Sequence, residues 1–200
     1  MRIIIVGASG IIGKALCRFL KRDHEVIAAS RSSCEYQIDI TKPDSVKRFF
    51  DNVGKFDALV CTVGESAFVP LSEADEEQFM YGINSKLLGQ VRLVSTGMKY
   101  ISNHGSFTLT SGIISEVPGI NTALVGMVDS AIEGFVRNAA YELERGIRIN
   151  VVSPNVLEET YDKFSEAFPG FTPISLERLI PVYRDIIEGV SSGQVIKVFR

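Results

Sequence analysis

A short apolar run that ends in three evenly spaced glycines constrains this chain more than any other feature. Residues 3–6 are Ile-Ile-Ile-Val, and Gly7, Gly10 and Gly13 follow, ahead of apolar residues at helical spacing. Small residues let the backbone approach a pyrophosphate, and the helix that begins there offers free N–H groups and a positive dipole end. A tight turn without a ligand is the alternative, but the strand–turn–helix context favours a nucleotide-binding turn.

Strands and helices are predicted to alternate along all 200 residues. Apolar runs predict the strands, and apolar residues at helical spacing predict the helices between them. This alternation predicts an α/β protein with a single doubly wound parallel sheet of about seven strands in three α/β/α layers, the Rossmann fold. We expect strands at 3–6, 25–29, 36–40, 58–61, 106–110, 147–152 and 194–199, with helices at 11–21, from Pro43, at 76–99 and at 123–144.

The composition is that of an ordinary globular chain with one core. Hydrophobic residues make up 46% and charged residues 22%, so we expect a single domain over 1–200, with about 155–190 as a segment that covers the substrate. A net charge of −3 disfavours nucleic acid and anionic membrane surfaces as partners. The cysteines are scattered, the histidines lack metal-ligand spacing, and no signal-peptide pattern begins the chain. We therefore expect reduced thiols, no metal and a cytoplasmic location.

The ends of the predicted strands, where ligands bind in such sheets, carry the candidate nucleotide site. The second strand ends in Ala29-Ser30-Arg31-Ser32, without the carboxylate that NAD binders usually place there. Arg31 could instead pair with a 2′-phosphate, so we expect NADP in preference to NAD, unless Arg31 is a solvated loop residue. Asp39 could also simply cap the next helix. The predicted cofactor-binding residues of this half are Gly7, Ser9, Gly10, Ile11, Ile12, Gly13, Arg31, Ser32, Asp39, Ile40, Thr62, Val63 and Gly64.

Over nearly its whole length the chain resembles the short-chain dehydrogenase/reductase family. The glycine turn and Asp39 match family motifs, and Cys61-Thr62-Val63-Gly64 stands where the family has Asn-Asn-Ala-Gly. Thr110-Ser111-Gly112 and Gly82-Ile83-Asn84-Ser85 match the segments of its catalytic serine and asparagine, and Ser153-Pro154-Asn155 resembles its Ser-Pro-Gly. The resemblance implies catalytic roles for Ser111 and Asn84, and cofactor contacts for Asp129, Pro154, Asn155 and Val156. The alternatives are a serine that caps a turn and an asparagine bonded within its helix.

The resemblance breaks at the family's Tyr-x-x-x-Lys pair. The segment 131–135 matches the stretch after that lysine, which places Val125 at the tyrosine position and Asp129 at the lysine position. In the family the tyrosine transfers a proton and the lysine holds the ribose. Val125 cannot exchange a proton, although the carboxylate of Asp129 could still accept hydrogen bonds from the ribose. Tyr161, Glu158 and Glu159 are candidate replacement acids that no pattern brings to the site.

Three functions remain open at this stage. The first is hydride transfer from NADPH to a small carbonyl with an atypical proton donor, and the second is a non-catalytic NADP-binding sensor or partner subunit. The third, an extended-type nucleotide-sugar or flavin reductase, is disfavoured because little chain remains for a substrate domain. The aromatic residues Tyr161, Phe164, Phe168 and Phe171 form either an apolar lid or ordinary helix packing, and the substrate is unknown.

The resemblance also implies an oligomer. Family members commonly pair the two long helices, here 76–99 and 123–144, between subunits, so we expect a homodimer or homotetramer. The apolar residues that could fill such an interface are Leu87, Leu88, Val91, Leu93 and Val94, unless they belong to the core of the chain itself.

Overall fold

The computed structural model, which describes residues 1–199, confirms the doubly wound parallel sheet. All strand pairs are parallel, and the strand order is β3-β2-β1-β4-β5-β6-β7. Strand order reverses between β1 and β4, and in such sheets ligands bind at the carboxyl ends next to that reversal. The strands are β1 (Arg2–Val6), β2 (Glu25–Ser30), β3 (Tyr36–Gln37), β4 (Phe56–Cys61), β5 (Ile101–Thr110), β6 (Arg148–Pro154) and β7 (Val195–Val198).

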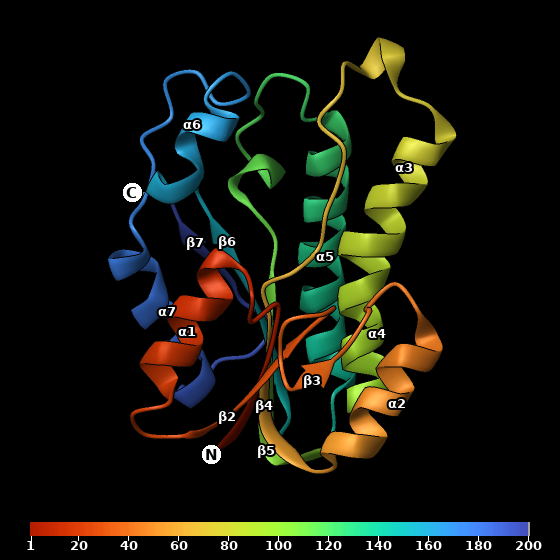
Figure 1. The fold of residues 1–200 in the computed structure, drawn as a ribbon, viewed down its shortest axis with the longest axis vertical. Coiled ribbons are helices and arrows are strands. Elements are labelled where there is room, and N and C mark those ends of the chain that lie inside the picture. The colour runs from red at the N-terminus through yellow and green to blue at the C-terminus, as the bar shows by residue number, and fades with distance from the viewer. Residues whose placement is uncertain (200) are drawn as a thin grey trace.

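Helices cover both faces of the sheet (Figure 1). Successive side chains of a strand point to opposite faces, so Ile3 and Ile5 pack under α1 and α7, whereas Ile4 and Val6 join the core on the other face. The α-helices are α1 (Ile11–Leu20), α2 (Pro43–Val53), α3 (Glu76–Gly82), α4 (Leu88–Gly97), α5 (Ala123–Glu142), α6 (Tyr161–Phe164) and α7 (Leu176–Glu188). Short helical turns are η1 (Leu71–Glu73), η2 (Ile83–Leu87), η3 (Ile113–Ser115) and η4 (Glu158–Thr160).

The helix expected over 76–99 is divided into three pieces. The α-helices α3 and α4 are joined by η2, which is a π-helical turn. A π turn holds one more residue than an α turn and shifts the direction of the side chains that follow it. The single-helix prediction was therefore wrong in the part that carries Asn84 and Lys86.

Two segments whose residues disfavour regular structure lie inside regular elements. Residues 103–105, Asn-His-Gly, lie inside β5, where His104 takes a φ of 61° and the pairing with β4 shifts register. Pro181 lies inside α7. Its helix continues because Leu179 and Tyr183 are completely buried against α1 and the sheet, and this burial offsets the lost hydrogen bond.

The long helices contribute to the core of this chain as well as to its surface. Leu93 and Val94, proposed above for an interface between subunits, are 0% and 3% exposed and belong to the main core. Leu87 packs against the same core, whereas Leu88 and Val91 are half-buried. Leu93 and Val94 therefore belong to the core of the chain itself, which was the alternative to an interface between subunits.

Two kinds of feature are absent from residues 1–199. None of their helices is long and apolar enough to cross a membrane. No group of three or more His, Cys, Asp or Glu side chains within this range is arranged to hold a metal ion.

Candidate functional site

The glycine turn between β1 and α1 is built so tightly that two of its positions exclude side chains. Gly7 has a φ of 94°, and a Cβ on Gly13 would lie 2.1 Å from the carbonyl oxygen of Gly7. Gly10 is the N-cap residue of α1, and no side chain of residues 1–199 caps this helix. The first-turn N–H groups of α1 are therefore left to bind an anion, as a pyrophosphate requires.

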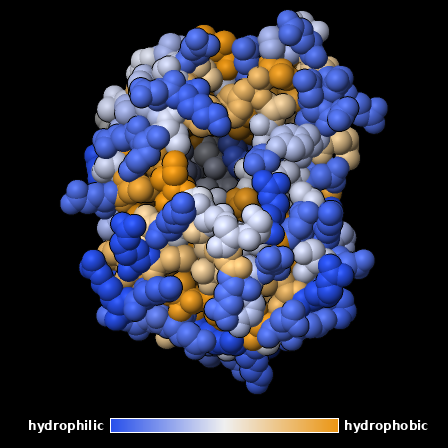
Figure 2. Space-filling view, viewed as in Figure 1, coloured by the Kyte–Doolittle hydropathy of each residue, from blue (hydrophilic) through white to orange (hydrophobic). Residues whose placement is uncertain are grey.

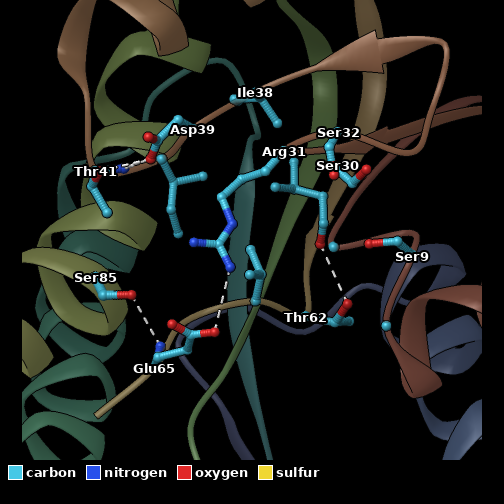
Figure 3. A pocket seen from close by; sticks show the side chains of 15 residues that line it. Ser9, Ser30, Arg31, Ser32, Ile38, Asp39, Thr41, Thr62, Glu65 and Ser85 are labelled. Carbon is cyan, nitrogen blue, oxygen red and sulfur yellow. Dashed lines mark hydrogen bonds and ion pairs between the residues drawn. The ribbon is translucent and has the colours of Figure 1, made fainter.

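A cavity of about 280 Å³ opens beside this turn, between the ends of β2, β3 and β4 (Figure 3). Arg31 reaches across it toward Glu65, with 3.5 Å between Nη2 and Oε1. Glu65 also accepts a hydrogen bond from the hydroxyl of Tyr81, and this bond raises the pKa of Tyr81. The backbone N–H of Glu65 donates to Oγ of Ser85 at 3.0 Å. The cation predicted to bind a 2′-phosphate is thus already next to an anion.

Most of the predicted cofactor-binding residues gather around this cavity. Its lining includes Gly7, Ser9, Gly10, Arg31, Ser32, Asp39, Ile40, Thr62 and Val63, whereas Ile11, Ile12, Gly13 and Gly64 are not among its lining residues. Asp39 does not cap α2, because Lys42 is the N-cap residue. Its carboxylate instead accepts hydrogen bonds from the hydroxyl and backbone N–H of Thr41, and these bonds lower the pKa of Asp39.

A second hollow, of about 180 Å³, lies at the ends of β5 and β6. Figure 2 shows that the face seen in Figure 1 is hollowed near its centre, with apolar side chains gathered above the opening. Five of the predicted site residues line the second hollow, namely Ser111, Asp129, Pro154, Asn155 and Val156. Its other lining residues include Lys86, Val125 and Thr160, together with Phe68, Phe164 and Phe168.

Ser111 is held by an acid that its own sequence segment does not reveal. Its hydroxyl donates to Oε1 of Glu133 at 3.0 Å, and the hydroxyl of Ser115 donates to the same oxygen at 2.6 Å. Arg137 pairs with the other carboxylate oxygen at 3.3 Å. Glu133 is only 3% exposed, so its hydrogen bonds fix both serines, of which Ser111 lines the hollow.

Asp129 does not present a free carboxylate to the hollow. Its Oδ1 lies 2.5 Å from Nζ of Lys86, and its side chain is 1% exposed against 15% for Lys86. Burial raises the pKa of Asp129, and the adjacent ammonium of Lys86 opposes this effect. The ribose contact expected of Asp129 stays a prediction, and Lys86 is the more exposed member of the pair.

Asn84 and Asn155 each form hydrogen bonds within the chain, Asn84 through its backbone carbonyl and Asn155 through its side-chain amide. The backbone carbonyl of Asn84 accepts a hydrogen bond from Arg92 at 3.2 Å, and Asn84 does not line the second hollow. The side-chain amide of Asn155 donates to the carbonyls of Thr172 and Phe199, each at 2.9 Å. Asn155 thereby ties the segment over the hollow to the end of the chain.

The segment over the hollow is shorter than the sequence predicts. Phe164 and Phe168 line the hollow, and Phe171 packs on Phe168 at a ring-centroid distance of 5.1 Å. The lining does not include Glu158, Glu159 or Tyr161, the candidate replacement acids. Helix α7, which falls within 155–190, packs on α1 in the core. The lid interpretation therefore applies best to about 155–174.

Sequence reasoning missed three charged residues of the site: Glu65, Lys86 and Glu133. Glu133 and Lys86 each carry a charge at an inward position of an otherwise apolar helix face, and a buried charge needs a partner. These buried charges could have been recognised in the sequence. The pairing of Lys86 with Asp129 could not have been predicted, because it depends on the π turn and joins positions 43 residues apart.

Comparisons with known proteins agree with this geometry. A family model described as enoyl-(acyl carrier protein) reductase matches residues 13–186. Tetrahydroxynaphthalene reductase from Pestalotiopsis fici is 30% identical over 177 residues, which make up 84% of this chain and 62% of that reductase. The structure of protein lin1944 from Listeria innocua matches with a TM-score of 0.97 and 41% identity over the full length of both chains. A small-chain dehydrogenase solved in complex with NADPH matches with a TM-score of 0.87 and 26% identity, covering 99% of this chain and 96% of that one.

Proposed function

The chain belongs to the short-chain dehydrogenase/reductase family, and on this premise we propose that it binds NADP(H) and transfers a hydride to a small carbonyl compound. Bound NADPH would supply the hydride. The residues of the chain bind and orient the two reactants, exclude water and deliver a proton.

The observation that carries the cofactor proposal is the position of Arg31 on the same cavity as the glycine turn. The free N–H groups of α1 suit the pyrophosphate, and the guanidinium of Arg31 suits a 2′-phosphate, because it can donate two parallel hydrogen bonds to one phosphate. The end of β2 offers no carboxylate to a ribose hydroxyl, which disfavours NAD. The NADPH complex of the 26% identical dehydrogenase supports the same choice.

The second hollow would hold the carbonyl compound beside the nicotinamide. Ser111 lines it with a hydroxyl fixed by Glu133, and Pro154 and Val156 line it at the end of β6. We propose that Ser111 orients the substrate, while Val125 and the phenylalanines exclude water. Asn84 lies in η2, the turn that carries Lys86, so its part would be to hold that turn.

A calorimetric titration with NADPH, NADP⁺, NADH and NAD⁺ tests the cofactor proposal. We expect NADPH and NADP⁺ to bind more tightly than their counterparts without the 2′-phosphate, and Arg31→Ala to remove that difference. Each 1.4 kcal/mol of binding free energy corresponds to about a tenfold change in Kd. Equal affinities for NADPH and NADH in the unaltered protein would contradict the role of Arg31.

A non-catalytic NADP-binding protein is the second candidate, and one observation favours it. Val125 stands where the family has its tyrosine, and it is 5% exposed against the hollow. Such a protein would bind NADPH and consume none. Steady oxidation of NADPH, followed at 340 nm with a panel of aldehydes and ketones, would exclude this candidate, whereas binding without turnover across the panel would favour it.

We also propose that the chain works in the cytoplasm as a homodimer or homotetramer paired through α4 and α5. The three cysteines are free thiols, which suits a reducing compartment. Half-buried Leu88 and Val91 on α4 and exposed Met127 on α5 are available to a partner. Light scattering tests the assembly, and a particle of 22.0 kDa at working concentration would contradict it.

A further inference from the structure

The ion pair between Lys86 and Asp129 lies in the wall of the second hollow. Two glycines beside it leave room for the two side chains. A Cβ on Gly64 would lie 2.8 Å from Cα and Cγ of Lys86, and a Cβ on Gly112 would lie 3.0 Å from Oδ2 of Asp129. The backbone on both sides thus approaches the pair more closely than other residues would allow.

Lys86 is the cationic side chain that reaches this hollow. Among the described residues that line it, Lys86 is the only lysine, arginine or histidine. Asp129 lines the same hollow but is 1% exposed against 15% for Lys86, so the ammonium is the more accessible of the two charges to an incoming molecule. The π turn η2 directs Lys86 there from a helix other than the one that carries Asp129.

The size and walls of the hollow restrict what it can hold. Its volume is about 180 Å³, and an apolar protein cavity of roughly 150 Å³ holds one benzene molecule. Phe68 packs against Phe164 and Phe168 at centroid distances of 5.3 Å and 6.4 Å, so aromatic rings form one wall. Aromatic side chains favour offset or edge-to-face contact with another ring. The hollow therefore suits a single aromatic ring better than an extended or polar molecule.

We infer that this hollow takes a single-ring aromatic carbonyl compound whose oxygen lies at the ammonium of Lys86, and that Lys86 is the acid of the reaction. This inference rests on the proposed function. Asp129 is a positioning residue, since it touches Lys86 and not the substrate.

Reduction at this site would move one hydride and one proton to the carbonyl compound. The carbonyl carbon accepts the hydride that NADPH supplies, and the electron pair of the C=O π bond moves to oxygen. That oxygen takes a proton from Nζ of Lys86, which is left as a neutral amine and regains a proton from solvent. A positive charge placed beside the developing oxyanion in an apolar hollow stabilises it without reorganisation.

Benzoate is the first probe, because it combines one ring with an oxyanion and cannot be reduced at this site. We expect benzoate to bind the NADP⁺-loaded protein, and Lys86→Met to weaken its binding by about tenfold or more. Lys47→Met is the matched control, since Lys47 pairs with Asp51 on the exposed face of α2, and it should leave the affinity unchanged. No binding to the unaltered protein, or equal binding to Lys86→Met, would overturn the inference.

Benzaldehyde is the second probe, and Lys86→Arg separates charge from proton donation. The guanidinium keeps the positive charge but does not release its proton. We therefore expect this variant to bind benzoate and to reduce benzaldehyde about 10²- to 10⁴-fold more slowly than the unaltered protein. Reduction by Lys86→Arg at the original rate, or no reduction by the unaltered protein, would overturn the role as acid.

The double variant Lys86→Met with Asp129→Asn distinguishes a catalytic lysine from a merely structural one. Lys86→Met alone leaves Asp129 buried without a partner and lowers the urea midpoint, whereas the double variant removes that unpaired charge. We expect its urea midpoint to recover while benzoate binding stays weak. Recovery of both would overturn the inference. NADP⁺ titrated without benzoate reports separately on the proposed function, so that failure there is not confused with failure at Lys86.

Discussion

Glu65 is the residue that decides how freely Arg31 can meet a phosphate. The two side chains are 3.5 Å apart across the nucleotide cavity, and both are mostly exposed, so their attraction is weak and competes with any anion that enters. A 2′-phosphate must displace Glu65 or share Arg31 with it. The selectivity for NADP thus depends on a side chain from the loop after β4 as well as on the end of β2.

We predict that Glu65→Gln strengthens the binding of NADPH. Removing the competing carboxylate frees Arg31, and exposed ion pairs are worth about 0.2–1 kcal/mol, so Kd should fall by about 1.4- to 5-fold. The affinity for NADH should not change. Calorimetry measures both, with Glu144→Gln at the opposite end of the sheet as the control. An unchanged or weaker affinity for NADPH would show that Glu65 does not compete.

We predict that the stability conferred by Asp129 depends on pH. Burial raises the pKa of Asp129 above the usual value of about 3.9. Between that value and the raised pKa, the folded chain holds a proton that the unfolded chain has released. The free energy of unfolding therefore falls as pH rises through this window. Asp129→Asn removes the titration, so urea denaturation of both proteins should show the original protein losing stability relative to the variant as pH rises. Parallel pH profiles would contradict this.

The residue scale is also where the sequence informs least. Gly7, Gly10 and Arg31 could be assigned from strand, turn and composition, because those cues are local. Lys86 and Asp129 could not be paired, because each belongs to a different helix and their meeting depends on how the two helices pack.

At the scale of elements, α3 and η2 together set the direction of Lys86. Helix α3 has only seven residues, and it begins at a capping box in which Asp75 accepts from the N–H of Gln78 at 2.9 Å and Gln78 accepts from the N–H of Asp75 at 3.0 Å. A helix this short depends on its cap, since it makes few internal hydrogen bonds.

We predict that Asp75→Ala lowers the free energy of unfolding by about 1 kcal/mol, because the N–H of Gln78 in the first turn of α3 loses its acceptor. Urea denaturation measures the change. Asp75→Asn, which keeps an acceptor at the same place, should lose much less, and a loss as large as that of Asp75→Ala would mean that the cap is not the cause. Neither substitution touches the nucleotide cavity, so NADPH affinity should be unchanged.

Most elements could be predicted because their cues are short-ranged. Alternating apolar runs and helical spacing identify the strands and the main helices, and their ends differ from the observed ones by a few residues. The π turn and the continuous α7 could not be predicted. No local residue pattern marks the π turn. In α7, the burial of Tyr183 outweighs the tendency of Pro181 to break a helix.

At the scale of the whole molecule, the parallel sheet brings residues from the ends of β1, β2, β4, β5 and β6 to one edge. That convergence could be predicted once the alternation of strands and helices was recognised. The division of this edge into a nucleotide cavity and a smaller aromatic hollow could not be predicted, because it depends on the conformations of loops and side chains. The last residues of β5 and β4 are joined at this edge, because the hydroxyl of Thr110 donates to the carbonyl of Cys61 at 2.7 Å and also lies 2.8 Å from the hydroxyl of Tyr183.

Cys61 therefore reports on unfolding of the whole molecule. It is 0% exposed on β4 between β1 and β5, and burial raises the pKa of its thiol to about 12. Only the thiolate reacts with alkylating and disulfide reagents, so Cys61 should be inert at pH 8 while the sheet is intact.

In the variant Cys17→Ser with Cys34→Ser, we predict that labelling of Cys61 follows the unfolded fraction measured by urea denaturation. Bound NADPH should slow the labelling further, because it stabilises the folded state alone. Mass spectrometry after timed alkylation measures the rate. Rapid labelling in the absence of urea would mean that the carboxyl edge opens locally, without unfolding of the sheet.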